Sequence, residues 1–342
     1  MISITIPPEH NDIEKRLIFL LHISDSQIKK YYSMKECLQD VEKAFTYYQT
    51  SNVITPVRLS LAHAKKAHTL YMPSYVEKIA YASVKIVSIF PNNAKRNKET
   101  LQSMIVLTET ESGDHVATLD ASYLTVMRTG AISGLGTKYL AREDATILSV
   151  IGCGSQAIGQ ILAMLEVRPI TKILLTNRTV EKAHQLKNKL LSLFANKNLT
   201  IEVVKSANDA VSEADIVVCS TSSSTPVFSG EALKRGTHIN AIGSYQPQMQ
   251  EIDSITLQRS NKIVVDTKEG AEHEAGDLLI PHQNGEWSLN RIYCELGDLI
   301  VGNKNGRERD DEVTLLNSVG VAFLDTICAS SIYQKIKKLN EL

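Results

Sequence analysis

The sequence lacks any apolar run long enough to span a bilayer. Its longest runs, such as Leu17 to Leu21, are far shorter than the about 20 residues that a membrane helix needs. The N-terminal stretch MISITIPPEH has no basic region followed by a long apolar segment, so we expect no secretory signal. The five cysteines are widely spaced without a C-x-x-C pair, which argues against a disulfide framework or structural zinc site. These absences predict a cytoplasmic protein.

An excess of charge of one sign is also lacking. Lys and Arg number 37, Asp and Glu 38, and the formal net charge is -1. Without a basic excess or an acidic tail, we expect neither nucleic acid nor a membrane surface as partner. Hydrophobic residues make up 43% of the chain and charged residues 22%, which is typical of a globular protein. A length of 342 residues favours two domains.

The front of the chain mixes short strands and helices, which predicts an α+β domain. Apolar residues at helical spacing follow Ser33, and Ser33 with Glu36 forms a capping-box pattern. A second helix is predicted from Asp120 to about Tyr139. Strand-like runs lie between these helices: HTLYMPSY, YASVKIVSIFP, SMIVLTET and HVATLD.

The pattern changes after residue 145. Strand-like runs TILSVIG, TKILLTN, ADIVVCS, GTHINAIG and NKIVVDT alternate with helical segments, which predicts a parallel sheet covered on both faces. We therefore predict an α/β protein with two domains. A Rossmann-type dinucleotide-binding domain covers residues 131–320, and a substrate-binding and dimerisation domain combines residues 1–130 with 321–342.

A glycine-rich turn follows the first strand of the second domain. Gly152, Gly154 and Ala157 form the G-x-G-x-x-A pattern of dinucleotide-binding proteins, with Ser155 and Gln156 between them. Gly152 allows the tight turn, Gly154 lets the backbone approach a pyrophosphate, and Ala157 lets the helix pack closely on the sheet. The helix N-terminus then offers N–H groups to phosphate. The alternative is a strand-to-helix turn without a ligand.

The end of the next strand bears on cofactor choice. An NAD-preferring site carries an acidic residue about 20 residues after the glycines. This sequence has Asn177, Arg178 and Thr179 there, which are donors with one positive charge. The pattern favours NADPH, with NADH as a weaker cofactor. Arg178 as a solvated arginine and Thr179 as a helix cap are the alternative.

Other candidate cofactor neighbours lie at later strand ends. Nucleotide loops commonly fall at the carboxyl ends of parallel strands. Ser220 and Thr221 follow one strand, Gly243 follows the next, and Ser318 and Gly320 precede the final helix.

Three basic residues of the front domain have apolar or turn surroundings: Arg58 in ITPVRLSL, Lys85 in YASVKIVSIF and Arg128 in LTVMRTGAIS. Lys85 lies in a run typical of a buried strand, and a buried lysine is costly unless paired. We expect an anionic substrate to supply that partner. A surface charge or an internal ion pair is the alternative for each residue.

These segments together resemble the ornithine cyclodeaminase and mu-crystallin family. The matching pieces include PVRL, LYMPSY, SVKIVSIFPNN, LDASYLTVMRTGAISGLGTKYLA, IGCGSQA, EAGDLL and GRERDDEVTLLNSVGVAFLD. The resemblance implies that Arg58, Lys85 and Arg128 bind a substrate carboxylate, that Lys85 also acts in catalysis, and that the front domain and last helix form a homodimer. It also implies a nucleotide on the second domain.

One position separates the reactions of this family. Cyclodeaminase-like members carry an aspartate base two residues after the glycine that matches Gly243, where this sequence has Tyr245 after Ser244. A tyrosine with a pKa near 10 is a poor base at neutral pH. The resemblance therefore implies an NADPH-dependent reductase of Δ1-pyrroline-2-carboxylate or Δ1-piperideine-2-carboxylate, which makes L-proline or L-pipecolate. An ornithine cyclodeaminase, an alanine dehydrogenase and a non-catalytic NADPH-binding protein are the alternatives.

The remaining polar candidates predict no further site. EHEAGD, residues 272–277, groups His273 with three carboxylates but does not place two histidines on one helix face, so we expect no metal. Cys153 and Cys219 at apolar strand ends are expected to pack, and His238 at a strand start is expected to be structural.

Overall fold

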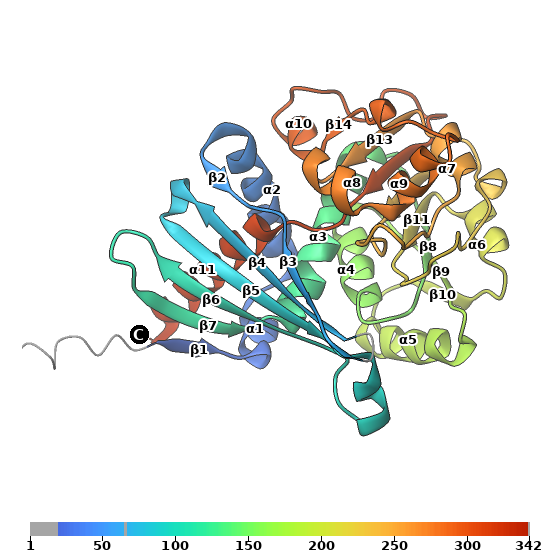
Figure 1. The fold of residues 1–342 in the computed structure, drawn as a ribbon. Helices are drawn as coiled ribbons and strands as arrows, with labels where there is room; N and C mark the ends of the chain where they lie inside the picture. Colours follow the sequence, from blue (N-terminus) through green and yellow to red (C-terminus); the bar gives the residue numbers. More distant parts are fainter. Residues whose placement is uncertain (1–19, 65–66, 341–342) are drawn as a thin grey trace, which may run out of the picture.

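Two β-sheets carry the fold (Figure 1). The structure is a computed structural model and describes residues 20–64 and 67–340. The segment on which no secretory signal was predicted therefore lies outside the described residues. No helix in the described part of the chain combines the length and apolarity needed to cross a membrane.

The first sheet comes from the front of the chain. Its order is β1-β7-β6-β5-β4-β2, with β3 also paired to β4, and its pairs are antiparallel except β1 with β7. The strands are β1 (Leu21–Ile23), β2 (Val53–Ile54), β3 (Leu59–Ala62), β4 (His68–Val76), β5 (Tyr81–Ile89), β6 (Leu101–Glu109) and β7 (His115–Asp120). Its helices are α1 (Asp25–Tyr31), α2 (Met34–Thr50), α3 (Ser122–Leu140) and α11 (Ala322–Asn340).

The second sheet is parallel throughout, in the order β10-β9-β8-β11-β12-β15-β13-β14. Its strands are β8 (Ile147–Ile151), β9 (Lys172–Thr176), β10 (Thr200–Val203), β11 (Ile216–Cys219), β12 (His238–Ala241), β13 (Lys262–Val265), β14 (Cys294–Glu295) and β15 (Thr314–Asn317). Its helices are α4 (Ala157–Val167), α5 (Val180–Leu193), α6 (Ala207–Glu213), α7 (Ser254–Arg259), α8 (Lys268–Glu274), α9 (Gly276–Gln283) and α10 (Leu296–Ile300).

This topology confirms the predicted Rossmann-type α/β fold. The strand order reverses at β8, where β9 lies on one side and β11 on the other. Ligands of open parallel sheets bind at such a reversal, beyond the carboxyl ends of the strands. The glycine turn follows β8 directly and opens α4, so the fold places it at the expected binding edge.

Two helices connect the sheets. α3 runs between them, packing on α2 and α4, and passes through residues 130 and 131, where the domain boundary was predicted (Figure 1). Most residues of α3 are buried. α11 follows the last strand of the second sheet but packs along β4 and β5 of the first. The chain therefore passes between the two sheets twice, once through α3 and once from β15 into α11. Both helices carry charged residues.

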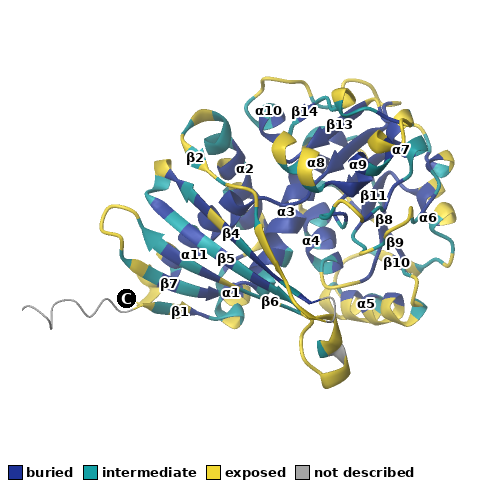
Figure 2. Cartoon of the chain, in the orientation of Figure 1, coloured by how far each residue is buried: buried dark blue, intermediate teal, exposed yellow. Residues whose placement is uncertain are grey.

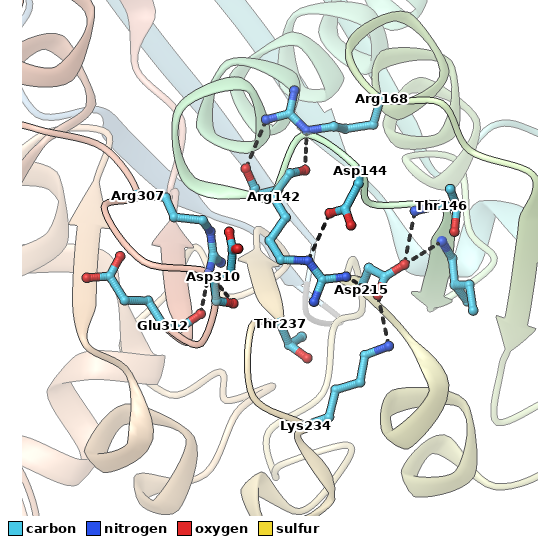
Figure 3. Close-up of polar contacts among 12 residues, drawn as sticks. Arg142, Asp144, Thr146, Arg168, Asp215, Lys234, Thr237, Arg307, Asp310 and Glu312 are labelled. Carbon is cyan, nitrogen blue, oxygen red and sulfur yellow. Dashed lines mark hydrogen bonds and ion pairs between the residues drawn. The ribbon is translucent and has the colours of Figure 1, made fainter.

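A cluster of charged side chains fixes the end of α3 (Figure 3). Arg168 donates to the carbonyls of the last turn of α3, and Arg307 donates to the Leu140 carbonyl at 2.7 Å. Such carbonyls have no partner within a helix. Asp215 accepts from Arg142 at 3.0 Å and pairs with Lys234 at 2.8 Å. The cluster thereby anchors α3 to the loops at the amino ends of the second sheet's strands.

Candidate active site

A cavity of about 160 Å³ lies where the two sheets meet. It brings together three predicted substrate residues and four predicted cofactor residues: Arg58, Lys85, Arg128, Ser155, Gln156, Ser318 and Gly320. These residues come from the segment before β3, from β5, from α3, from the glycine turn and from the loop after β15. Segments far apart in the sequence therefore converge on one space.

Lys85 and Arg128 are buried beside the same carboxylate. Lys85 is fully buried on β5, as its apolar strand predicted, and its Nζ lies 2.6 Å from Asp325 Oδ2. Arg128 Nε lies 3.3 Å from Asp325 Oδ1. The expectation that an anionic substrate supplies the partner of Lys85 was thus wrong in one respect. A carboxylate from α11 already pairs with it, because the chain itself must offset the cost of a buried charge.

The buried charges do not cancel. Lys85, Arg128 and Asp325 together carry one unit of positive charge when Lys85 is protonated. Burial and the neighbouring Arg128 lower the pKa of Lys85 to about 7, while Asp325 acts in the opposite direction. An anion in the cavity would balance this charge and favour the protonated lysine. The site is therefore suited to a ligand with one carboxylate.

Arg58 lines the same cavity from the segment before β3. Its Nη2 lies 2.7 Å from Glu274 Oε2 and donates to the carbonyls of Val319 and Gly320 at 2.9 and 2.8 Å. Burial raises the pKa of Glu274, and Arg58 opposes this effect. Arg58 thus joins the front segment to α8 and to the loop after β15. Glu274 belongs to the EHEAGD stretch, where it pairs with an arginine.

The glycine turn has the geometry that a pyrophosphate requires. Gly152 has φ +101°, and a Cβ there would lie 2.7 Å from the Ser220 carbonyl oxygen. Gly154 is exposed and a Cβ there would meet no atom within 4 Å, so its backbone faces open space. Ala157 is buried as the first residue of α4, and no side chain caps that helix. The free N–H groups and the small residues fit a dinucleotide.

The residues after β9 divide into two roles. Asn177 Oδ1 accepts from the Cys153 N–H at 2.9 Å, and its Nδ2 donates to the Thr179 carbonyl at 2.8 Å. Asn177 therefore holds the glycine turn and the start of α5. Thr179 is the N-cap of α5 but makes no side-chain cap bond. Arg178 and Thr179 are exposed, and neither lines the cavity.

The loops after β11 and β12 meet at a buried glutamate. Ser220 Oγ donates to the Gly152 carbonyl at 2.9 Å, next to the glycine turn. Glu251 accepts from the Thr221 N–H at 2.5 Å and from the Gly243 N–H at 2.6 Å. A Cβ on Gly243 would lie 2.1 Å from the Thr221 carbonyl oxygen. Glu251 thus holds these two loops together and does not line the cavity.

The loop between β15 and α11 is also held by a buried carboxylate. Asp266 accepts from Ser318 Oγ and from the Gly320 N–H, both at 2.7 Å. Gly320 has φ +81°, and a Cβ there would lie 2.8 Å from Arg128 Nη1. Glycine is therefore required where this loop passes the guanidinium of Arg128.

The rest of the cavity wall is largely apolar. Leu70, Met72 and Val87 of β4 and β5 lie on one side of it, and Tyr245 contributes an aromatic ring. Burial raises the pKa of Tyr245, and Arg58 opposes this effect. A tyrosine in this state is ionised even less at neutral pH than in water, so it is less available as a base. The cavity thus combines cations with a lining that is otherwise uncharged and largely apolar.

Comparison with known proteins identifies the relatives of this chain. The model of the ornithine cyclodeaminase/mu-crystallin family matches residues 21–340. The chain belongs to the ornithine cyclodeaminase/mu-crystallin family. It is 42% identical over 317 residues to a Δ1-pyrroline-2-carboxylate reductase of Bacillus cereus, covering 92% of this chain and 96% of the relative. The predicted family is therefore confirmed.

Solved structures of family members share the whole fold. The Δ1-pyrroline-2-carboxylate reductase of Thermococcus litoralis, in complex with NADH and L-proline, has a TM-score of 0.90 at 37% identity, with 94% and 98% of the two chains covered. An archaeal alanine dehydrogenase dimer with bound NAD has a TM-score of 0.86 at 31% identity, with 94% and 97% covered. The reductase of the family is thus more similar to this chain than the alanine dehydrogenase, in sequence and in structure.

Sequence reasoning missed the carboxylates that organise this family member's cavity: Asp325, Glu274, Asp266 and Glu251. Asp325 had a readable signal, because it stands in the apolar helical run VAFLDTICASS as Arg128 stands in its own helix. The other three lie in loops or at element ends. Their partners are backbone groups, the Ser318 hydroxyl or an arginine more than 200 residues away in sequence, so no local pattern marks them.

The cysteines and histidines that the sequence did not assign to a site are buried or hydrogen-bonded in the structure. Cys153 and Cys219 are buried, and burial raises the pKa of both thiols. His238 is buried with its Nδ1 at 3.0 Å from Thr314 Oγ1, and burial lowers its pKa to about 3. His273 Nδ1 lies 2.7 Å from the Glu269 carbonyl oxygen. None of these side chains lines the cavity.

Proposed function

We propose that this chain is an NADPH-dependent reductase that converts Δ1-pyrroline-2-carboxylate to L-proline, and that it also takes the six-membered Δ1-piperideine-2-carboxylate. The observation that carries the proposal is the shared cavity of Lys85, Arg128 and the glycine turn. An excess of buried positive charge there suits a carboxylate, while Leu70, Met72 and Val87 suit the methylene groups of an aliphatic ring.

The basic residues bind and orient the substrate. Arg128 presents a planar guanidinium that can hold a carboxylate through two parallel hydrogen bonds. Arg58 lines the cavity from the segment before β3, and Lys85 adds its charge from β5. The apolar wall excludes water from the ring. Together these contacts fix the imine carbon relative to the α4 N-terminus, and such positioning supplies much of the rate enhancement in a hydride transfer.

Lys85 also serves as the proton donor. A nicotinamide bound at the glycine turn would supply the hydride for the imine carbon, with the electron pair of the C=N bond going to nitrogen. Lys85 then gives its proton to that nitrogen, which completes the secondary amine of proline. A pKa of about 7 for Lys85 suits this role, because general acids work best near the operating pH.

The residues after β9 favour the 2′-phosphate of NADPH. Arg178 and Thr179 are exposed at the carboxyl end of β9, and the first carboxylate beyond them is Glu181 in the first turn of α5. Asn177 is occupied by the Cys153 N–H and the Thr179 carbonyl. An acid to receive the ribose 2′-hydroxyl is thus absent directly after β9. The Thermococcus relative was solved with NADH, so NADH is the appropriate comparison.

A cytoplasmic homodimer is the assembly that we propose. Apolar side chains Ile54, Leu59 and Leu61 are exposed on β2 and β3 at one side of the first sheet (Figure 2). Exposed strands that carry apolar side chains are typical of surfaces that another chain covers. The archaeal alanine dehydrogenase relative is a dimer. Light scattering should report about twice the 37.8 kDa chain mass, and a fully active monomer would contradict the proposal.

A substrate panel tests the reaction. Oxidation of NADPH and NADH is followed with Δ1-pyrroline-2-carboxylate, with Δ1-piperideine-2-carboxylate and with pyruvate plus ammonia. With L-ornithine plus NAD⁺, formation of proline and release of ammonia are measured instead, because that conversion leaves NAD⁺ unchanged overall. The proposal expects turnover of the cyclic imines. Faster reaction with pyruvate and ammonia would make the chain an alanine dehydrogenase. Proline and ammonia from ornithine would make it a cyclodeaminase, and binding of NADPH without turnover would make it a binding protein.

A further inference from the structure

Asp325 contacts both buried cations of the cavity, Lys85 and Arg128. It lies in the first turn of α11, is fully buried, and does not line the cavity itself. Its two oxygens face different elements: Oδ2 is 2.6 Å from Lys85 Nζ of β5, and Oδ1 is 3.3 Å from Arg128 Nε of α3. A carboxylate in this position acts on a ligand only through its two neighbours.

We propose that Asp325 is a positioning residue of the reduction, which fixes Lys85 and Arg128 relative to each other and favours the charged form of Lys85 in the cavity. The inference rests on the proposed role of Lys85 as proton donor. It assigns to the final helix a direct influence on the chemistry, beyond its packing on the first sheet.

The charges around Lys85 support this assignment. α3 contributes Arg128 and the segment before β3 contributes Arg58, and both arginines disfavour the charged form of Lys85. The neighbours of Lys85 on the adjacent strands are Met72 on β4 and Ile105 on β6, which are uncharged. Asp325 from α11 is thus the group that favours the protonated lysine. Without it, burial and two arginines would act on Lys85 unopposed.

The surrounding contacts fix Asp325 in turn. The next residue, Thr326, lies with its Oγ1 2.7 Å from Ser83 Oγ of β5, and it also pairs with Ser74 of β4. α11 is therefore held against the two strands at the level of Lys85. Gly320 with φ +81° lets the preceding loop pass close to Arg128. The carboxylate is held in place before any ligand binds, as efficient proton transfer requires.

Asp325→Asn tests the inference against Asp325→Glu and Thr326→Val. Asn keeps the shape and removes the charge, whereas Glu keeps the charge. Val removes a buried hydroxyl next to Asp325, so it reports the effect of weakened packing alone. The measurement is the pH dependence of kcat/KM for imine reduction, which reports ionisations of the free enzyme and free substrate. The titration of the substrate is common to all variants.

The sign of the shift follows from the charges. Protonated Lys85 is the active form, so activity falls as pH rises through its pKa. Loss of the Asp325 charge lowers that pKa further, so the falling limb of Asp325→Asn should move at least one pH unit to lower pH. The kcat at neutral pH should fall at least tenfold, with a smaller change in KM. Asp325→Glu should keep the wild-type limb, and Thr326→Val should keep it even with a lower unfolding temperature.

Binding provides a second readout that needs no turnover. Pyrrole-2-carboxylate is a planar carboxylate of the same ring size, and its affinity can be followed by calorimetry across pH. Its binding should weaken at lower pH in Asp325→Asn than in the wild type. This measurement separates the inference from the reaction. If the wild type fails to reduce the imine, but the ligand still dissociates from Asp325→Asn at lower pH than from the wild type, the reductase is contradicted and the role of Asp325 stands.

Two outcomes would overturn the inference. The first is a folded Asp325→Asn variant whose pH profiles of activity and binding coincide with those of the wild type. The second is an equal loss of folding in Asp325→Asn and Asp325→Glu, because the residue would then serve the core irrespective of its charge.

Discussion

Gly130 of α3 and Gly159 of α4 lie in direct backbone contact. A Cβ on Gly130 would lie 2.2 Å from the Gly159 carbonyl oxygen, and a Cβ on Gly159 would lie 2.3 Å from the Val126 carbonyl oxygen. Because neither glycine has a side chain, the two helices approach more closely than helices with side chains at the contact can. α3 carries Arg128 and α4 begins at the glycine turn. This contact therefore sets the distance between the substrate residues and the cofactor loop.

Gly130→Ala should disturb that distance. The added methyl group meets backbone that cannot turn away, so α3 and α4 must separate, and overpacking of this kind costs about 1–3 kcal/mol. We expect a lower unfolding temperature and a lower kcat/KM, both measured on the purified variant. Ser133→Ala is the matched control in the same helix: its buried hydroxyl has no hydrogen-bond partner in the described residues, so its loss should be nearly neutral. Wild-type activity in Gly130→Ala would show that the contact does not set the site.

Arg128→Ala should separate substrate binding from cofactor binding. Loss of the guanidinium removes a charge-assisted pair and misplaces the imine carbon, so kcat/KM should fall by about two or more decades. NADPH binding, measured by fluorescence, should change little. Tyr245→Phe serves as the control in the same cavity and should keep substantial activity, since we assign the phenol no base role. A comparable loss in both variants would contradict this assignment.

Arg178→Ala addresses the choice of cofactor. A hydrogen bond to a charged group contributes about 1.5–3 kcal/mol, which corresponds to roughly ten- to more than a hundredfold in affinity. NADPH should therefore lose affinity by that factor, while NADH should change little. Dissociation constants of both cofactors for the wild type and the variant give the comparison. Equal weakening of NADH and NADPH would mean that Arg178 does not bind the 2′-phosphate.

The pH dependence of the two directions should be opposite. Burial and Arg128 lower the pKa of Lys85 to about 7. Reduction needs the protonated lysine, so its kcat/KM should fall as pH rises above about 7. Oxidation of L-proline needs the neutral lysine as proton acceptor and should rise over the same range. Initial rates in both directions between pH 5 and pH 9, at constant ionic strength, check this. Profiles that move together would exclude Lys85 as the group that exchanges the proton.

Much of the fold could be predicted because its signals are local. The alternation of apolar strands and helices after residue 145 indicated the parallel sheet, and Gly152, Gly154 and Ala157 marked the binding edge. The capping box of Ser33 and Glu36 is present at the start of α2. Each pattern reflects a requirement that neighbouring residues meet among themselves, such as helix capping or a tight turn.

The candidate site could be predicted only in part because its charges pair over long distances. Lys85 was recognised as a buried cation, yet its partner Asp325 lies 240 residues later and reaches it only when α11 packs on β5. Arg58 meets Glu274 in the same manner. Asn177, which the sequence pattern assigned to the cofactor, holds the glycine turn through Cys153, and its contact with the cofactor stays a prediction. Which of several polar partners a side chain takes is decided by packing, and the sequence pattern does not contain it.

Transfer of deuterium from NADPH labelled at C4 on its reactive face is the decisive test of imine reduction by this chain. Δ1-pyrroline-2-carboxylate is reduced with the labelled cofactor, and the product is resolved by chirality and examined by mass spectrometry and NMR. We expect L-proline with one deuterium at C2, and one NADPH consumed for each proline formed. Proline without deuterium at C2, or no proline from the imine while L-ornithine yields proline and ammonia, would contradict imine reduction by this chain.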